Sequence, residues 1–345
     1  MNDLEQALET LANKGVNPKI LRTILRDLET SPNPAQLSGF SDGNGGDSLP
    51  IQGRTSPAAA EPSDPERPVR LSLQQLNNLR QRLTPRDFKV LADLNKFRFL
   101  FTNQIQRFFF TESESRRTNL INTNRALKKL REYGVITPLK RSIGGFKAGS
   151  SSMIWHLTEG GYRMLNLLNA EQYPRKRFDA PSTLFLAHTL AIAETAVQLT
   201  TICRASESHT LKVADPEPSC WRAYQEDGKK MFLKPDLYAV TTETDSDGEK
   251  YEDSWFIEMD LGTESPNQVV EKCQAYLRYF NTGIEQTVKG VFPVVVWLVK
   301  DEARKERLRQ SIRDNLPPQP KLFLVITPDQ LGKMVRQYLN QNEMC

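Results

Sequence analysis

The sequence predicts an α+β protein of several domains, and three observations support this. A chain of 345 residues is too long for one small core and corresponds to two or three domains. From residue 71, helical apolar patterns come first, and after residue 181 helices and strands alternate. Between residues 31 and 70 the composition changes to Pro, Gly, Ser, Asp and Ala. Because such a segment buries little apolar surface, we expect a disordered linker there.

Residues 1–30 carry two short amphipathic patterns. Leu4, Leu8 and Leu11 share one helical face, and a second apolar stripe lies between residues 20 and 28. Two short helices bury little by themselves. We therefore expect a helical hairpin that docks a partner or a second copy of the chain. A loosely held N-terminal extension is the alternative.

The positive charge is concentrated in one segment. Residues 71–180 hold 20 Lys and Arg against 8 Asp and Glu, a net charge of +12, whereas residues 1–70 and 181–345 carry −3 and −5. A phosphate-binding surface is expected to show such a concentration. A merely solvated charged face is the alternative, although its signs are usually interspersed.

The cysteine, histidine and apolar contents argue against other classes of protein. Cys203, Cys220, Cys273 and Cys345 share no CxxC spacing, and with only 3 histidines a Cys/His zinc site is not expected. No apolar run approaches the ~18–20 residues that a membrane span requires. The N-terminus also lacks a signal-peptide pattern. We therefore expect a cytoplasmic protein with reduced thiols and no membrane partner.

Residues 71–178 have the element order of a winged helix-turn-helix. Thr84-Pro85-Arg86-Asp87 is a capping pattern for a first helix. Thr102 is expected to cap a short second helix, and Gly134 to end a long third one. The expected strands, about 135–142 and 152–157, enclose a glycine-rich tip. Thr158 then caps a closing helix.

The long third helix separates polar from apolar residues. Leu120, Ile121, Leu127 and Leu130 are expected to pack inward. The opposite face fits the DNA major groove, where Arg and Asn reach base edges and Lys128 and Lys129 contact phosphate. With the wing, the predicted contacts to double-stranded DNA are Arg116, Arg117, Asn124, Lys128, Arg131, Lys140, Arg141 and Lys147. A winged helix used for protein contact is the alternative.

Three carboxylates are expected to converge in the second half of the chain. Asp236 lies in one predicted strand, and Glu258 lies in another, 22 residues later, with Asp260 on the same side of that strand. Crowded carboxylates need a cation, and such oxygen ligands favour Mg²⁺ or Mn²⁺. We expect these three residues to bind the ion, which would polarise a phosphodiester. Alternatively, Glu258 or Asp260 pairs with Lys234 or Lys272.

The pattern Pro-Asp…Glu-x-Asp resembles the PD-(D/E)xK nuclease core, whose helix–strand–strand–strand–helix–strand order matches residues 182–299. The resemblance implies an α/β restriction-endonuclease-like domain over residues 179–345. Its usual lysine is replaced here by Asp260. In relatives of that fold the lysine can come from the next helix, which makes Lys272 the fourth catalytic candidate, on a stripe with Gln268 and Tyr276. Glu194, on the first helix of this domain, is a candidate further ligand.

Several segments together resemble the plasmid replication-relaxation protein family: 157–162, 186–191, 234–236 and 256–264. The likeness covers about residues 80–300. It implies a DNA-binding protein of a plasmid or other mobile element, acting in replication or DNA relaxation. The N-terminal hairpin lies outside the likeness, and we expect it to recruit replication or mobilisation proteins. The resemblance leaves open a metal-dependent DNA endonuclease or a non-catalytic adaptor or transcriptional regulator. His188 belongs to the pattern, but a lone histidine on an apolar helix is more often a core residue, so no catalytic role is assigned to it.

Overall fold

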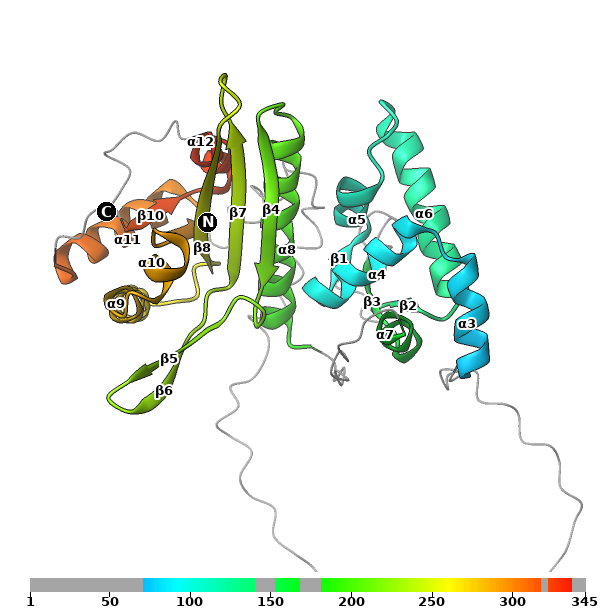
Figure 1. Ribbon diagram of the computed structural model, residues 1–345, viewed down its shortest axis with the longest axis horizontal. Helices are drawn as coiled ribbons and strands as arrows, with labels where there is room; N and C mark the ends of the chain where they lie inside the picture. Colours follow the sequence, from blue (N-terminus) through cyan, green and yellow to red (C-terminus); the bar gives the residue numbers. More distant parts are fainter. Residues whose placement is uncertain (1–70, 140–152, 168–180, 318–321, 337–345) are drawn as a thin grey trace, which may run out of the picture.

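The computed structural model describes residues 71–139, 153–167, 181–317 and 322–336. The expected N-terminal hairpin, the expected linker and the tip of the wing lie outside these ranges. Within them, the protein is a mixed α+β structure in which a helical lobe lies beside a sheet lobe (Figure 1).

The helical lobe is built from α-helices around a small sheet. Its helices are α3 (Leu73–Arg82), α4 (Pro85–Phe97), α5 (Thr102–Phe109), α6 (Arg116–Glu132) and α7 (Glu159–Asn166). Its strands are β1 (Leu100–Phe101), β2 (Ile136–Pro138) and β3 (Ile154–Leu157), in the antiparallel order β1-β3-β2. The predicted caps of α4 and α7 are confirmed, because Thr84 and Asp87 form a capping box and Thr158 accepts from Gly161 N.

One predicted cap is wrong. Thr102 is the first residue of α5, and Phe101 is its N-cap. The Thr102 hydroxyl instead accepts a hydrogen bond of 2.9 Å from the buried indole N–H of Trp155. A buried indole N–H needs an acceptor, so the side chain of Thr102 connects α5 to β3.

The sheet lobe is centred on a five-stranded mixed sheet. Its strands are β4 (His209–Pro216), β7 (Leu237–Thr244), β8 (Lys250–Asp260), β9 (Val294–Val299) and β10 (Phe323–Ile326), in the order β10-β9-β8-β7-β4. Neighbours among β4, β7 and β8 are antiparallel, and neighbours among β8, β9 and β10 are parallel. The smaller elements are the hairpin of β5 (Arg222–Glu226) and β6 (Lys229–Leu233), with α10 (Ile284–Lys289), η3 (Pro328–Gln330) and α12 (Leu331–Val335).

Helices cover both faces of this sheet. Helix α8 (Thr183–Arg204) packs on one face, where Ala193 and Val197 share a core with Ile257. Helices α9 (Pro266–Asn281) and α11 (Glu302–Asn315) pack on the other, where Cys273 and Leu308 share a core with Phe256. The alternating side chains of the central strands therefore enter two separate layers.

Helix α8 also joins the two lobes. Its core continues into α4 and α5, and Gln104 on α5 donates a hydrogen bond of 3.1 Å to the carbonyl of Leu190. Among the described helices, α8 is long and apolar enough by length and composition to cross a membrane, which corrects the expectation that no such segment exists. In this structure 56% of that apolar window is buried. Contact with both lobes accounts for its composition.

The strand that was predicted to contain Asp236 is interrupted. Residues 229–233 form β6, which pairs with the unpredicted β5, and β7 starts at Leu237. Pro235 lies in the break, and proline cannot donate to a sheet ladder. Asp236 therefore lies directly before a strand, at the end of the sheet, and not within a strand.

Candidate functional site

Asp236 and Glu258 lie next to each other at one end of the central sheet. Leu237 is opposite Ile257 in the antiparallel register of β7 and β8, so Asp236, one residue earlier, is beside Glu258. The Asp236 Oδ2 atom accepts a hydrogen bond of 2.7 Å from the Met259 N–H. Period-two spacing puts Glu258 on the same face as Phe256, towards α9.

Helix α9 supplies two contacts to the buried carboxyl of Glu258. The hydroxyl of Tyr276 donates to Oε1 over 2.6 Å, and the Lys272 ammonium donates to Oε2 over 3.2 Å. Lys272 also donates to Glu264 Oε1 over 2.6 Å. Of the predicted stripe, Lys272 and Tyr276 therefore face Glu258. Gln268 does not, because it is exposed and caps the start of α9 with Ser265.

Burial and neighbouring charges shift the pKa values of Glu258 and Lys272. Burial, and then the negative charge of Asp236, raise the pKa of Glu258 to about 8. Burial acts to lower the pKa of Lys272, but the charges of Glu258, Asp236 and Glu264 and the hydrogen bond to Glu264 outweigh it and raise that pKa. The ion pair between Glu258 and Lys272, one of the alternatives open from the sequence, is present in the structure.

His188 reaches Asp236 from the opposite helical layer. Its Nε2 atom lies 3.2 Å from Asp236 Oδ1. Burial acts to lower the pKa of His188, but the hydrogen bond and charge of Asp236, followed by the charge of Glu217, raise it above the usual value. No role was predicted for this residue from the sequence. The available signal was its place in the 186–191 segment that carries the family resemblance.

Asp260 does not join this pair, which corrects the expected cluster of three carboxylates. The Arg304 Nε atom, on α11, donates to Asp260 Oδ2 over 2.6 Å, and Asp260 is fully buried. Glu194 is also elsewhere, because it pairs with Arg107 of the helical lobe over 2.5 Å. The positive charge of an arginine from another element therefore neutralises each of these two buried carboxylates. Within the described residues, no group of three His, Cys, Asp or Glu side chains is placed to hold a metal ion.

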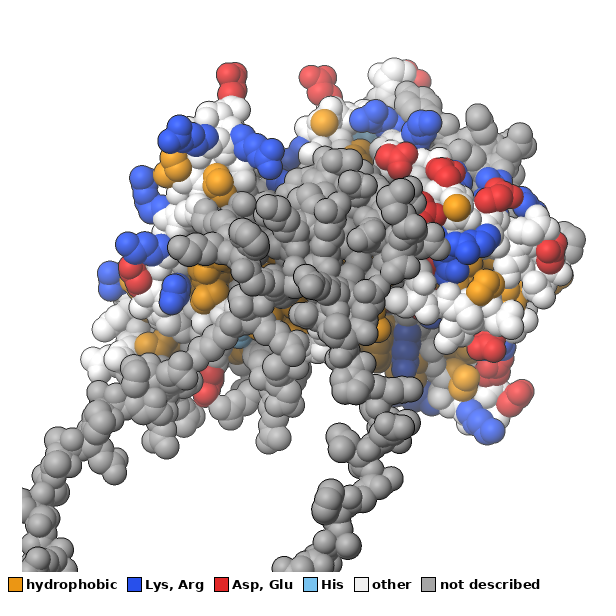
Figure 2. Space-filling model, turned by 180° about the vertical axis from the view of Figure 1, so that it is seen from behind, with side chains coloured by type: hydrophobic (Ala, Val, Ile, Leu, Met, Phe, Trp, Pro, Cys, Tyr) orange, Lys and Arg blue, Asp and Glu red, His pale blue; other side chains and the backbone are white. Residues whose placement is uncertain are grey.

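Helix α6 presents a basic face to solvent. Figure 2 shows Lys and Arg side chains gathered over the helical lobe, whereas the two signs mix over the sheet lobe. The exposed cations of α6 are Arg116, Arg117, Arg125, Lys128 and Arg131. Asn124 is half-buried, and the remaining predicted contacts (Lys140, Arg141 and Lys147) lie outside the described residues.

Two residues of α6 have surroundings that were not predicted for them. Ile121 is 49% exposed on the basic side and does not pack inward, because Asn119 and Thr123 take the buried positions beside it. Lys129 forms an ion pair of 2.5 Å with the buried Asp87 of α4. Lys129 therefore ties α6 to α4, a contact that was not predicted for it.

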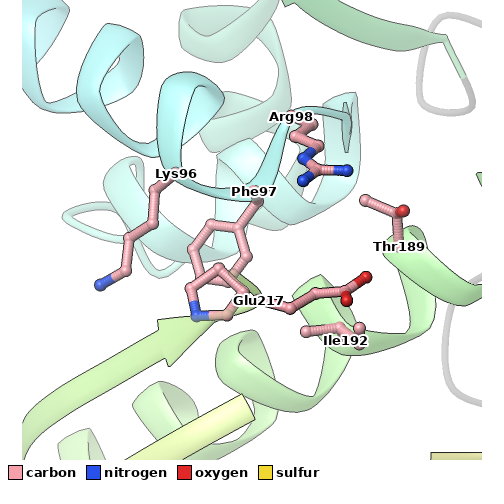
Figure 3. A pocket seen from close by; sticks show the side chains of 7 residues that line it. Lys96, Phe97, Arg98, Thr189, Ile192 and Glu217 are labelled. Atoms are coloured by element: carbon pink, nitrogen blue, oxygen red, sulfur yellow. The ribbon is translucent and has the colours of Figure 1, made fainter. Parts of the chain in front are cut away.

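A pocket lies where the two lobes meet beside the carboxylate pair. It is lined by Lys96, Phe97, Arg98, Thr189, Ile192, Pro216 and Glu217 (Figure 3). Glu217 connects it with the site, because its backbone N–H donates over 2.9 Å to the carbonyl of Asp236. The pocket therefore brings cations of the helical lobe near the end of the sheet that carries Asp236.

The fold and the site define a mixed α+β protein with a basic helical lobe and a carboxylate pair at the end of a sheet. The replication-relaxation family matches residues 91–295, more than half of the chain. The chain belongs to the replication-relaxation family. Membership indicates a role in the replication or relaxation of a plasmid or other mobile element. No curated protein and no solved structure matches the chain.

Proposed function

We propose that this protein binds duplex DNA of a plasmid or other mobile element on its helical lobe and cleaves a phosphodiester bond at Asp236 and Glu258. The adjacency of these two carboxylates at the end of the sheet carries the cleavage proposal. The exposed basic face of α6 carries the binding proposal.

The helical lobe supports DNA binding through its topology. The order α4, β1, α5, α6, β2, β3, with the sheet order β1-β3-β2, resembles that of a winged helix and supports the proposal. In such modules the helix at the position of α6 enters the major groove. Arg117, Lys128 and Arg131 are exposed on α6, where they can meet phosphates or base edges.

The sheet lobe supports cleavage through its resemblance to the PD-(D/E)xK core. Helix α8, the antiparallel strands β4, β7 and β8, helix α9 and the parallel strand β9 follow the order of that core. Asp236 directly precedes its second strand, and Glu258 lies in its third. Lys272 on α9 brings an ammonium to Glu258, where Asp260 replaces the usual lysine.

The two carboxylates fit a Mg²⁺ or Mn²⁺ ion. Mg²⁺ in enzymes is commonly held by one or two carboxylates, together with substrate phosphates and water. The repulsion between Asp236 and Glu258, which contributes to the raised pKa of Glu258, would be relieved by a divalent cation. When bound, the ion would supply Lewis acidity and lower the pKa of a coordinated water molecule.

The surrounding residues have separate roles in this proposal. Lys272 is 41% exposed and can extend its ammonium to the scissile phosphate, where it would neutralise developing charge. Tyr276 and His188 are positioning residues, because they hydrogen-bond to the carboxylates of Glu258 and Asp236 and fix their orientation.

Nicking of supercoiled plasmid tests the proposal. The wild-type protein should convert it to open circles with Mg²⁺ or Mn²⁺ and not with EDTA. Asp236→Asn should abolish nicking and keep DNA affinity within about twofold, since the DNA is held elsewhere. Asp247→Asn is the matched control, because Asp247 is an exposed aspartate in the turn between β7 and β8. Equal nicking by wild type and Asp236→Asn would overturn the cleavage proposal.

A non-catalytic adaptor or transcriptional regulator is the second candidate function. One observation favours it: both carboxyl oxygens of Glu258 already have partners within the protein, Tyr276 and Lys272. A site satisfied in this way needs no ion. This candidate predicts duplex binding without nicking in any divalent metal, and the same plasmid assay distinguishes the two.

A further inference from the structure

We propose that the β5–β6 hairpin is a binding arm for single-stranded DNA, which leads one strand to Asp236 and Glu258. The inference rests on the proposed function, because it names the form of DNA that reaches the carboxylate pair. The hairpin projects from the sheet lobe and connects β4 to β7 (Figure 1).

One face of the hairpin packs inward and the other does not. Tyr224 and Leu233 are buried in the core beneath α9, and Met231 packs partly against it. Since side chains alternate along a strand, Lys230 and Phe232 lie on the opposite, outer face. Phe232 is 47% exposed there. The hairpin can therefore be held firmly by its inner face while its outer face stays accessible.

The outer face carries lysines beside one exposed aromatic ring. The Lys230 ammonium lies 5.1 Å from the centre of the Phe232 ring. The Lys234 ammonium lies 4.8 Å from the ring of Trp221, which is partly buried against the core beneath α9. The cross-strand partners of Lys230 and Phe232 are Gln225 and Ala223, neither of which carries a charge. Lys230 and its neighbouring ring are thus not opposed by carboxylates across the hairpin.

This arrangement fits single-stranded DNA. Single strands bind where aromatic rings stack on bases and cations meet the backbone, without requiring a particular sequence. A duplex keeps its bases stacked on one another, so it gives an exposed Phe232 nothing to stack on. The lysines and the exposed ring of Phe232 therefore favour a strand whose bases are free.

The arm runs directly into the candidate site. Asp236 follows Lys234 by two residues, and the intervening Pro235 is held by Cys220, whose thiol donates to its carbonyl over 2.9 Å. At ~3.3 Å per residue, Lys230 is at most roughly 20 Å along the chain from Asp236. A strand lying on Lys230, Phe232 and Lys234 would therefore extend to the carboxylate pair.

Tryptophan fluorescence can report binding at this place. Trp155, Trp255 and Trp297 are buried, whereas Trp221 is partly exposed. Titration with a 20-nucleotide oligodeoxythymidine should quench the fluorescence of the full-length protein, and Trp221→Phe should remove the quenching. Fluorescence anisotropy of the labelled oligonucleotide then gives the affinity of every variant.

The variants measure stacking and charge separately. Phe232→Ala should weaken oligonucleotide binding by on the order of tenfold, the effect of removing the ring on which one base stacks. Lys230→Ala and Lys234→Ala should each reduce the log–log salt slope by about 0.7. The matched controls are Tyr251→Ala and Lys250→Ala. Both residues are exposed and lie at the start of β8, at the end of that strand away from Glu258. These controls should leave both quantities unchanged.

The proposed binding arm would be overturned if affinity and salt slope were unchanged in Phe232→Ala, Lys230→Ala and Lys234→Ala. It would also be overturned if the control variants changed them as much as the hairpin variants. Circular dichroism confirms that each variant is folded. If the protein nicks plasmid but its oligonucleotide binding does not depend on Phe232, the binding arm is rejected and the cleavage proposal stands. If oligonucleotide binding depends on the hairpin but the protein does not nick plasmid, the cleavage proposal is rejected and the binding arm stands.

Discussion

The His188 imidazole of α8 and the Asp236 carboxylate, directly before β7, meet at the end of the central sheet, with 3.2 Å between Nε2 and Oδ1. Helix α8 covers the face opposite to the one that Glu258 enters. The contact is possible because Asp236 precedes the first paired residue of β7, where the sheet no longer separates the two layers. Asp236 is thus held by His188 and by the Met259 N–H independently of Glu258.

Without divalent metal, the protein should lose stability as the pH rises. The pKa of Glu258 is raised from 4.5 to about 8 on folding. The contribution of the protonated Glu258 to folding stability is therefore fully present below pH 4.5 and is lost as the pH rises through about 8. The raised pKa of His188 acts in the same direction above its unfolded value of 6.5. Thermal unfolding in EDTA should show a larger fall in melting temperature between pH 6 and 9 for wild type than for Glu258→Gln. An equal fall in melting temperature for the two proteins would contradict the raised pKa of Glu258.

Arg304→Ala should destabilise the protein by about 3–5 kcal/mol, because it leaves the buried charge of Asp260 without a partner. Arg313→Ala on the same helix is the control, since Arg313 and Glu306 form an exposed pair whose removal should cost at most about 1 kcal/mol. Urea denaturation measures both changes. A similar small destabilisation in the two variants would show that the Asp260 pair is not required by the fold.

The basic face of α6 should set the salt dependence of duplex binding. Replacing Arg117, Lys128 and Arg131 together by alanine should reduce the log–log salt slope by about 0.9 for each phosphate that these side chains neutralise. Arg307→Ala with Arg313→Ala removes exposed positive charge from α11 and should leave the slope unchanged. Anisotropy of a labelled duplex from 50 to 200 mM salt gives the slopes. Equal slopes for wild type and the triple variant would mean that this face does not contact DNA.

Local signals predicted most helices and strands of both lobes. The capping pattern at Thr84 and the period-two spacing of Glu258 depend on neighbours in sequence, and the structure agrees with both. The extra hairpin was missed because β6 and β7 follow each other closely and were assigned to one strand, although Pro235 marks the break between them.

The contacts of the site depended on packing between distant elements. The sequence placed Asp260 with Glu258 by spacing, but Arg304, 44 residues later, takes it as an ion-pair partner. His188 and Asp236 are 48 residues apart and on different elements, so no local pattern joined them. Ile121 was assigned to the core because it is apolar, although Asn119 and Thr123 occupy the inward positions of α6.

Binding of Mn²⁺ tests the central claim most directly. Electron paramagnetic resonance at pH 7.5 measures the free ion and so gives the number of ions bound by the full-length protein. We predict one bound ion for wild type, none for Asp236→Asn or Glu258→Gln, and one for folded Asp260→Asn, because Asp260 pairs with Arg304. Binding that is absent from wild type, or that survives in both Asp236→Asn and Glu258→Gln, would contradict a metal site at these two carboxylates.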